Sequence, residues 1–302
     1  MLLGRLKDLP VKLGDVAERM AQGIRTSAND IYVVDIQTVD EQIYTVYSKQ
    51  LGREVQIEQN IVWPFLQGRE IKRYWLSPSS KFIIVPYTIQ NGKASLVSIQ
   101  DMKDKFPMVF NYFQENKKYL EDREHGRMRG NNWYAYVYPK NLEVMSQPKI
   151  LIPDIANHGQ FALDDSGQYA FTSGYGITIN KDIQLSPKYI LGLLNSKLLD
   201  FYLKSVSTPM QNGYFRYFTQ YIEQLPIRSI NFSDPTDTIR YQRMVLLVED
   251  MLALHKQATA VHLAQDKEMI QRQIQTTDEQ IDQLVYELYG LTEEEIKIVE
   301  GE

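Results

Sequence analysis

The sequence predicts an α+β fold in which a mixed-sheet domain precedes a region of long helices. Short runs of β-branched and aromatic residues, typical of strands, alternate irregularly with helical segments across residues 1–232. They do not repeat as the regular strand–helix–strand units that indicate a parallel sheet. Beyond residue 232 glycine is absent until Gly290, and apolar residues recur every three or four positions. We therefore expect an α+β domain at 1–232 and a helical, coiled-coil-like region at 233–302.

The expected strands are runs of β-branched and aromatic residues bounded by turn-forming residues. They are Ile31–Ile36, Tyr44–Tyr47, Val55–Ile57, Phe82–Tyr87, Trp133–Tyr138, Lys149–Pro153, two short strands within Phe161–Phe171, and Gly176–Ile179. Pro86 indicates a strand end or an edge, because proline cannot donate to a sheet ladder. Asn91-Gly92 is a hairpin turn signal. Residues 12–22 read as a short helix or the entry to a strand.

The expected helices follow apolar spacing and capping residues. One begins near Ser98, a second opens at Pro107, and a third covers Tyr189–Tyr202. In the C-terminal region the spacing predicts one long helix over about 236–275. Thr277–Gln280 and Thr292–Glu295 match capping boxes. Shorter helices are therefore expected at 278–289 and 293–300.

Charge is unevenly distributed along the chain. The net charge is −5, but residues 1–150 carry 21 Lys or Arg against 17 Asp or Glu. Residues 151–230 hold six of each, whereas residues 231–302 hold six against 15, a net charge of −9. The last quarter would repel a phosphate backbone. We expect it to face protein, while the mildly basic remainder suits an acidic partner.

Several classes of protein are excluded or disfavoured by composition. The chain has no cysteine, which excludes disulfides, thiolate metal sites and a cysteine nucleophile. Residues 1–12 carry charges every few positions and lack the apolar segment of a signal peptide. The longest apolar runs, such as Met244–Val248, are far shorter than the ~20 residues of a membrane span. We expect a cytoplasmic protein without membrane contact.

The motifs of DNA-modifying chemistry are missing or out of order. Adenine-N6 methyl transfer needs an Asn/Asp-Pro-Pro-aromatic motif around the flipped base, and this sequence has no Pro-Pro pair. A nuclease commonly places Pro-Asp before an Asp/Glu-x-Lys motif that binds Mg²⁺. Glu70-Ile-Lys72 precedes Pro153-Asp154, and Glu295-Ile-Lys297 lies far from it. We expect neither activity in this chain, and no cofactor or metal bound to it.

Cations mixed with aromatic and amide residues are the strongest functional signal. Arginine forks match guanine, and asparagine matches adenine, in the DNA major groove. The candidate DNA-binding residues are Arg127, Arg129, Asn131, Asn132, Arg123, Arg69, Lys72, Arg73, Arg25, Tyr214 and Arg216. For the Gly-flanked loop that carries Arg127 and Arg129, the alternative is a solvated surface loop, whose arginines pair with Glu121, Asp122 or Glu124. For Tyr214 and Arg216 the alternative is a structural turn.

A family resemblance runs through the chain in five ordered blocks. The segment LLNSKLLDFY, a Gly-aromatic-Arg stretch and LPI lie within Tyr189–Arg228. The other blocks are Lys12–Val34, Pro64–Tyr74, Tyr119–Arg123 with Asn131–Lys140, and Ile281–Gly301. Together they resemble the TaqI-like C-terminal specificity domain of type IIG restriction-modification enzymes and adenine-N6 DNA methyltransferases. The specificity subunits of type I restriction systems are more distantly similar.

This resemblance implies a module that recognises a double-stranded DNA target and is not itself an enzyme. A methyltransferase, often fused to a nuclease, would lie in cis or in trans outside this chain. S-adenosylmethionine, and Mg²⁺ where a nuclease is attached, would belong to that part. We expect at least one of Arg127 and Arg129 to read a base. Lys72 and Arg73 should contact phosphate. Arg123 should anchor either a phosphate or the loop that carries Arg127 and Arg129. The rival function is a non-catalytic protein-interaction scaffold.

Overall fold

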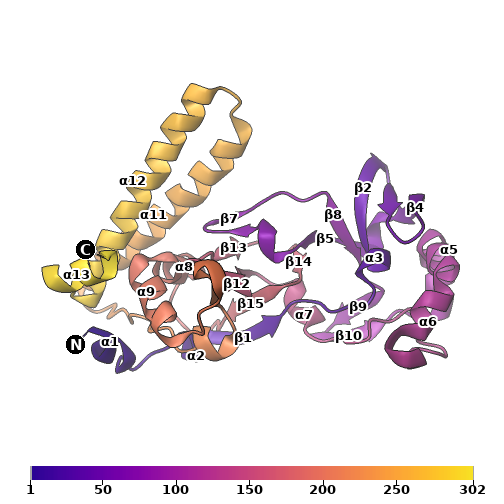
Figure 1. The fold of residues 1–302 in the computed structure, drawn as a ribbon, viewed down its shortest axis with the longest axis horizontal. Coiled ribbons are helices and arrows are strands. Elements are labelled where there is room, and N and C mark those ends of the chain that lie inside the picture. Colours follow the sequence, from indigo (N-terminus) through magenta and orange to yellow (C-terminus); the bar gives the residue numbers. More distant parts are fainter. Residues whose placement is uncertain (1, 302) are drawn as a thin grey trace.

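The computed structural model describes residues 2–301 as an elongated α+β molecule (Figure 1), which confirms the predicted fold class. A six-stranded sheet with its helices forms one end, and a four-stranded sheet lies in the middle. A helical hairpin projects from the end opposite the six-stranded sheet. None of the helices described is long and apolar enough to cross a membrane.

The six-stranded sheet has the order β14-β5-β8-β2-β3-β4. Its strands are β2 (Val33–Asp40), β3 (Ile43–Ser48), β4 (Arg53–Glu58), β5 (Val62–Leu66), β8 (Lys81–Ile84) and β14 (Ala170–Phe171). All neighbours are antiparallel except β14 and β5. The expected strands at 44–47, 55–57 and 82–87 are confirmed, although the last ends before Pro86. The strand expected at 31–36 begins later, because α3 (Asn29–Tyr32) precedes it.

The four-stranded sheet is antiparallel and has the order β1-β15-β11-β13. Its strands are β1 (Ala17–Gln22), β11 (Lys149–Pro153), β13 (Ala162–Asp164) and β15 (Gly174–Ile179). The predictions for 149–153 and 176–179 are confirmed. The two strands predicted within Phe161–Phe171 exist as β13 and β14, and they join different sheets.

Two helices cover residues 187–206, where one was expected. They are α8 (Pro187–Asn195) and α9 (Lys197–Val206). Ser196 separates them: its backbone is extended, with φ −68° and ψ 153°, and its hydroxyl accepts a hydrogen bond from the Leu199 amide. A serine in this role caps the next helix and ends the first.

The aromatic run Trp133–Tyr138 is not a strand, which corrects the prediction. Its residues from Trp133 to Val137 are buried, and they form a turn followed by bends. Side chains satisfy its carbonyls in place of a neighbouring strand. The Tyr32 hydroxyl donates to the carbonyls of Tyr134 and Ala135, at 2.9 and 3.2 Å. Aromatic side chains also favour strands, so their composition alone gave the wrong element.

Most of the connecting elements follow their predicted signals. Asn91-Gly92 joins β9 (Tyr87–Gln90) to β10 (Lys93–Leu96), with φ +50° and +71°. Ser98 caps α4 (Ile99–Lys105), and Pro107 opens α5 (Pro107–Glu115). The remaining elements are α1 (Leu2–Lys7), α2 (Leu13–Val16), η1 (Gln59–Ile61), η2 (Gly68–Glu70), β6 (Ile71–Lys72), β7 (Trp75–Leu76), α6 (Lys117–Gly126), α7 (Leu142–Met145), β12 (Ile155–Ala156), η3 (Gln211–Gly213), β16 (Phe215–Arg216) and α10 (Thr219–Ile222).

The C-terminal region is a helical hairpin, not a single long helix. α11 (Pro235–Ala260) and α12 (Ala264–Tyr289) run side by side after a reversal at 261–263 (Figure 1). Folding back lets the apolar seams of the two helices bury each other, which one straight helix could not do. Thr277 lies inside α12, so the helix start predicted there is wrong. Thr292 does cap α13 (Glu293–Glu300), and its reciprocal bond with Glu295 confirms the second capping box.

Two hydrophobic cores run through the chain. One lies under the six-stranded sheet and includes the buried aromatic run at 133–136. The other joins the four-stranded sheet, α8 and α9 to the hairpin, through residues such as Tyr189, Met244 and Leu284. Gly192 permits this contact, since a Cβ there would lie 2.5 Å from the Met244 sulfur. The domain boundary at residue 232 therefore stays a prediction from composition. The helical hairpin shares its hydrophobic core with residues that precede this boundary.

Candidate nucleic-acid interface

Three of the predicted DNA-binding residues line one surface hollow of about 460 Å³. Arg69 comes from η2, Lys72 from β6, and Tyr214 from the segment before β16. Asp154 and Gln160 line it as well. We call this site the cationic hollow. Arg69 and Tyr214, which meet here, are 145 positions apart in the sequence.

Close backbone approach brings these segments together. A Cβ on Gly68 would lie 2.6 Å from the Ser173 carbonyl oxygen, so only glycine allows η2 to approach that loop. The Asp154 amide donates to the same carbonyl at 3.2 Å. β12 then pairs with β16, which sets Ile155 opposite Arg216. The hollow is thus built from four segments, held together by backbone hydrogen bonds and by the close approach of Gly68 to Ser173.

The cations of the hollow differ in how free they are. Arg69 is 70% exposed and lies 2.7 Å from Glu70, through Nε and Oε1. An exposed pair of this kind contributes little and exchanges easily with another anion. Lys72 is exposed and forms no ion pair with any residue from 2 to 301. Lys72 is therefore the cation most available to an external phosphate.

An aromatic surface continues from the hollow along β16. Tyr214 is 42% exposed, and the Arg216 guanidinium lies 5.0 Å from the centre of the Phe218 ring. Phe218 in turn meets Tyr175 edge-on, with centroids 6.3 Å apart. Burial raises the pKa of the Tyr175 hydroxyl, Asp154 raises it further and Arg25 lowers it. Arg25 and Arg216 do not line the hollow, although Arg216 lies opposite its lining residue Ile155 in the β12–β16 pair.

The Arg127 loop lies in another part of the molecule. It follows α6, at the end opposite the helical hairpin (Figure 1). Gly126 and Gly130 bound this loop and have φ +83° and +109°, values that favour glycine. Arg127, Arg129, Asn131 and Asn132 are all exposed. Arg129 lies 2.8 Å from Asp122, as the solvated-surface alternative expected, whereas Arg127 has no carboxylate partner among the described residues.

Arg123 is buried, so it does not present its side chain to an external ligand as the other candidates do. Its residue is 6% exposed. Its guanidinium donates to four backbone carbonyls, those of Leu120, Thr26, Trp133 and Ala135, at 2.8–2.9 Å. Four of its five N–H donors are thus turned inward, and the residue anchors the loop, the other role predicted for it.

Arg73 is also not placed for the phosphate contact that the sequence predicted. Its side chain is 23% exposed and forms an ion pair with Asp278 of α12. The pair directs Arg73 toward the helical hairpin, away from Lys72. In the sequence both residues look alike, because a distant partner such as Asp278 leaves no local signal.

Two glutamine side chains of the hollow were not predicted from the sequence. Gln67 and Gln160 line it and are partly exposed. A glutamine amide can pair with the adenine edge in the major groove. Gln67 stands next to Gly68, but the close approach of Gly68 to Ser173 joins distant segments and leaves no local signal in the sequence. Within residues 2–301, no three His, Asp or Glu side chains gather as a metal site would require.

Comparison with known proteins gives the class of this chain. Residues 63–227, more than half of its length, match the model of the TaqI-like C-terminal specificity domain. The chain belongs to this family, which confirms the resemblance in its sequence. The matched segment contains both the cationic hollow and the Arg127 loop.

Curated relatives extend the match beyond that segment. The chain is 26% identical over 278 residues to the type II methyltransferase M.BstVI of Geobacillus stearothermophilus, covering 92% of the chain and 40% of that protein. It is 25% identical over 297 residues to the type II restriction enzyme and methyltransferase RM.Eco57I of Escherichia coli, covering 93% and 29%. The chain thus spans well under half the length of these relatives.

Proposed function

We propose that this chain recognises double-stranded DNA as the specificity module of a restriction-modification protein. The observation that carries the proposal is the cationic hollow, which lies inside the segment matched by a specificity-domain family. Its free cation, exposed tyrosine and amides are the groups that bind phosphate and base edges. The similarity to a type II methyltransferase and to a type II restriction enzyme and methyltransferase supports the same assignment.

In this proposal the chain chooses the sequence and positions a methyltransferase region, with or without a nuclease, in cis or in trans. The chain itself performs neither methyl transfer nor cleavage. S-adenosylmethionine, and Mg²⁺ for a nuclease, would bind that other region. The support is that no Pro-Pro-aromatic motif occurs in the 302 residues and that the relatives are much longer.

The two surfaces would divide the work of recognition. Phosphate contacts set register and orientation, and base contacts give specificity. We assign the phosphate contact to Lys72, with Arg69 and Arg216 beside it, and base reading to the Arg127 loop. The acidic region 233–302, with a net charge of −9, would repel the duplex and is left to contacts with protein.

Lys72→Ala is expected to weaken binding evenly across DNA sequences. Losing one phosphate contact should flatten the dependence of log affinity on log salt by about 0.9. The measurement is fluorescence anisotropy with short duplexes over a salt series. Lys93→Ala, which removes an exposed cation from β10, is the matched control and should leave the slope unchanged. Absence of salt-dependent duplex binding by the unaltered chain would overturn the proposal.

Arg127→Ala or Arg129→Ala is expected to relax preference at one base pair. A bidentate arginine–guanine contact is worth about 1–3 kcal/mol, and its loss should affect that position alone. Selection from a random duplex library reads the preference directly. Arg53→Ala, which breaks an exposed pair with Glu115 on the same end of the molecule, is the control. If both variants select the same sequence as the unaltered chain, the loop is not the reader.

A further inference from the structure

The turn that carries Lys72 has little local support. β6 and β7 are two residues each, and they pair Lys72 with Trp75 across the turn residues Arg73 and Tyr74. An isolated two-stranded hairpin is marginally stable even when it is longer than this. Tyr74 also has φ +58°, a left-handed conformation that bulky side chains avoid. The position of Lys72 must therefore be held by contacts from elsewhere.

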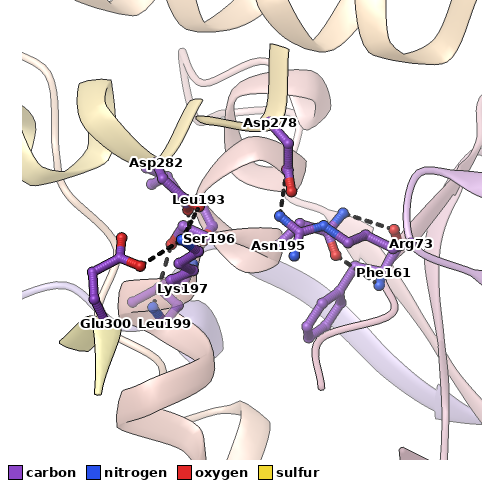
Figure 2. Close-up of polar contacts among 10 residues, drawn as sticks. All are labelled: Arg73, Phe161, Leu193, Asn195, Ser196, Lys197, Leu199, Asp278, Asp282 and Glu300. Atoms are coloured by element: carbon purple, nitrogen blue, oxygen red, sulfur yellow. Dashed lines mark hydrogen bonds and ion pairs between the residues drawn. The ribbon is translucent and has the colours of Figure 1, made fainter. Parts of the chain in front are cut away.

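Part of that support comes from the cores, in which Ile71 and Tyr74 are buried, and part comes from the helices. Arg73 forms its ion pair with Asp278 of α12 (Figure 2). Trp75 stacks on His255 of α11, with ring centroids 6.5 Å apart and planes 12° from parallel. The Tyr74 amide donates to the Phe161 carbonyl at 2.9 Å. The Asn195 amide at the end of α8 holds that same residue through two bonds of 2.8 and 3.0 Å (Figure 2).

Asp278 is itself on a fixed part of α12. One turn further along, Asp282 accepts a hydrogen bond from the Lys197 amide at the start of α9, at 2.8 Å (Figure 2). The Lys197 ammonium also pairs with Glu300 of α13. α12 is thus tied to α9 and α13 beside the place where it meets Arg73. Asp278 can therefore set the position of the short turn, because the helix that carries Asp278 is held in place and does not move with the turn.

The same junction contains unpaired polar atoms. Arg73 Nε, the Tyr74 hydroxyl and Asp282 Oδ2 are buried without a hydrogen-bond partner. Burying such groups costs stability, and a well-packed apolar junction would avoid that cost. Stability alone therefore gives no reason for this arrangement. The reason we infer is that the Arg73–Asp278 ion pair is directional, which an apolar contact is not.

We propose that Arg73 and Asp278 are positioning residues through which α12 holds Lys72 in the cationic hollow. The inference rests on the proposed function, because it takes Lys72 as a phosphate contact. It gives the hairpin, which lies beyond the family-matched segment, a part in DNA binding without touching DNA. When the pair is broken, the turn is released and Lys72 loses its fixed direction.

The test measures the cost of Lys72→Ala for duplex binding in four backgrounds of the full chain. These are the unaltered chain, Asp278→Asn, Arg73→Gln and Glu268→Gln. Asp278→Asn and Arg73→Gln break the pair from opposite sides and shift net charge in opposite directions. Glu268→Gln breaks the exposed Arg272–Glu268 pair on the same helix and matches the charge change of Asp278→Asn. Effects of charge at a distance cancel in such a cycle.

We expect Lys72→Ala to lower affinity about fivefold in the unaltered chain and in Glu268→Gln. In Asp278→Asn and Arg73→Gln the loss should fall below about twofold, because Lys72 is already displaced. An equal loss in all four backgrounds overturns the positioning role and leaves the proposed function intact. No loss on Lys72→Ala in the unaltered chain overturns the positioning role together with the hollow as a phosphate site. Asp278 is 29% exposed, so Asp278→Asn should still fold.

Discussion

Asp164→Ala is expected to lower the free energy of unfolding by about 3–5 kcal/mol, because it leaves a buried lysine charge unpaired. Lys149 Nζ lies 2.6 Å from Asp164 Oδ2, and the two side chains are 0% and 1% exposed. Burial lowers the pKa of Lys149, while Asp164 acts against that shift and favours the charged form. Without the carboxylate, the ammonium must either lose its proton or stay charged in an apolar place.

The carboxylate also organises the backbone around it. It accepts hydrogen bonds from the amides of Gln168 and Tyr169, at 3.2 and 3.0 Å. Lys149 donates to the Met145 carbonyl at 2.8 Å. The pair therefore joins the start of β11 to the turn between β13 and β14, which links the two sheets. The strands on either side of this turn were predicted, but the buried partner of Asp164 was not.

Urea unfolding of Asp164→Ala, Asp165→Ala and the double variant Lys149→Met/Asp164→Ala measures the effect. Asp165 is the exposed neighbour, and its loss should change the unfolding free energy by no more than about 0.5 kcal/mol. The double variant should recover the part of the loss that comes from the unpaired lysine charge, because replacing both partners of a buried pair by apolar groups is often neutral. The amides of Gln168 and Tyr169 still lose their acceptor, so recovery is incomplete. An Asp164→Ala protein within about 1 kcal/mol of the unaltered chain would contradict the argument.

Local signals predicted much of the fold. Strands with β-branched runs, the Asn91-Gly92 turn and the Thr292 cap were found because their causes lie within a few residues. The failures have causes outside the segment. Trp133–Tyr138 has the composition of a strand, but the partners of its carbonyls are the side chains of Tyr32 and Arg123. The reversal at 261–263 depends on two seams burying each other, which spacing along one helix does not show.

The candidate site was predicted in its parts and not in its arrangement. Composition marked Arg69, Lys72 and Tyr214 as cations and an aromatic worth considering. That they line one hollow depends on Gly68 meeting Ser173, a contact between distant segments. Composition could not separate Lys72, which is free, from Arg73, which is paired with Asp278. A single sequence does not distinguish an arginine that stabilises the fold from one that binds a ligand.

Arg123→Met is expected to lower the free energy of unfolding by about 3–5 kcal/mol and to release the Arg127 loop. Methionine fills the space of the alkyl chain but donates to none of the four carbonyls that Arg123 satisfies. The carbonyls of Thr26 and Trp133 would then be buried without this donor. The lost contact of the guanidinium with the Tyr32 ring, 5.6 Å from its centre, adds to the effect.

Hydrogen exchange and base selection together separate the two consequences for Arg123→Met. In Arg123→Met the amide exchange of residues 131–136 should accelerate, relative to the unaltered chain, more than that of the four-stranded sheet. The reason is that Arg123 bonds directly to the backbone of this segment. If the loop reads DNA, base preference should weaken at the same position as in Arg127→Ala. Arg127→Met is the matched control, since it makes the same chemical change at an exposed site and should leave stability within about 0.5 kcal/mol. Arg123→Lys should rescue little, because one ammonium cannot reproduce the planar fork that reaches four carbonyls. Full stability and unchanged exchange in Arg123→Met would show that the loop is held by its aromatic side chains alone.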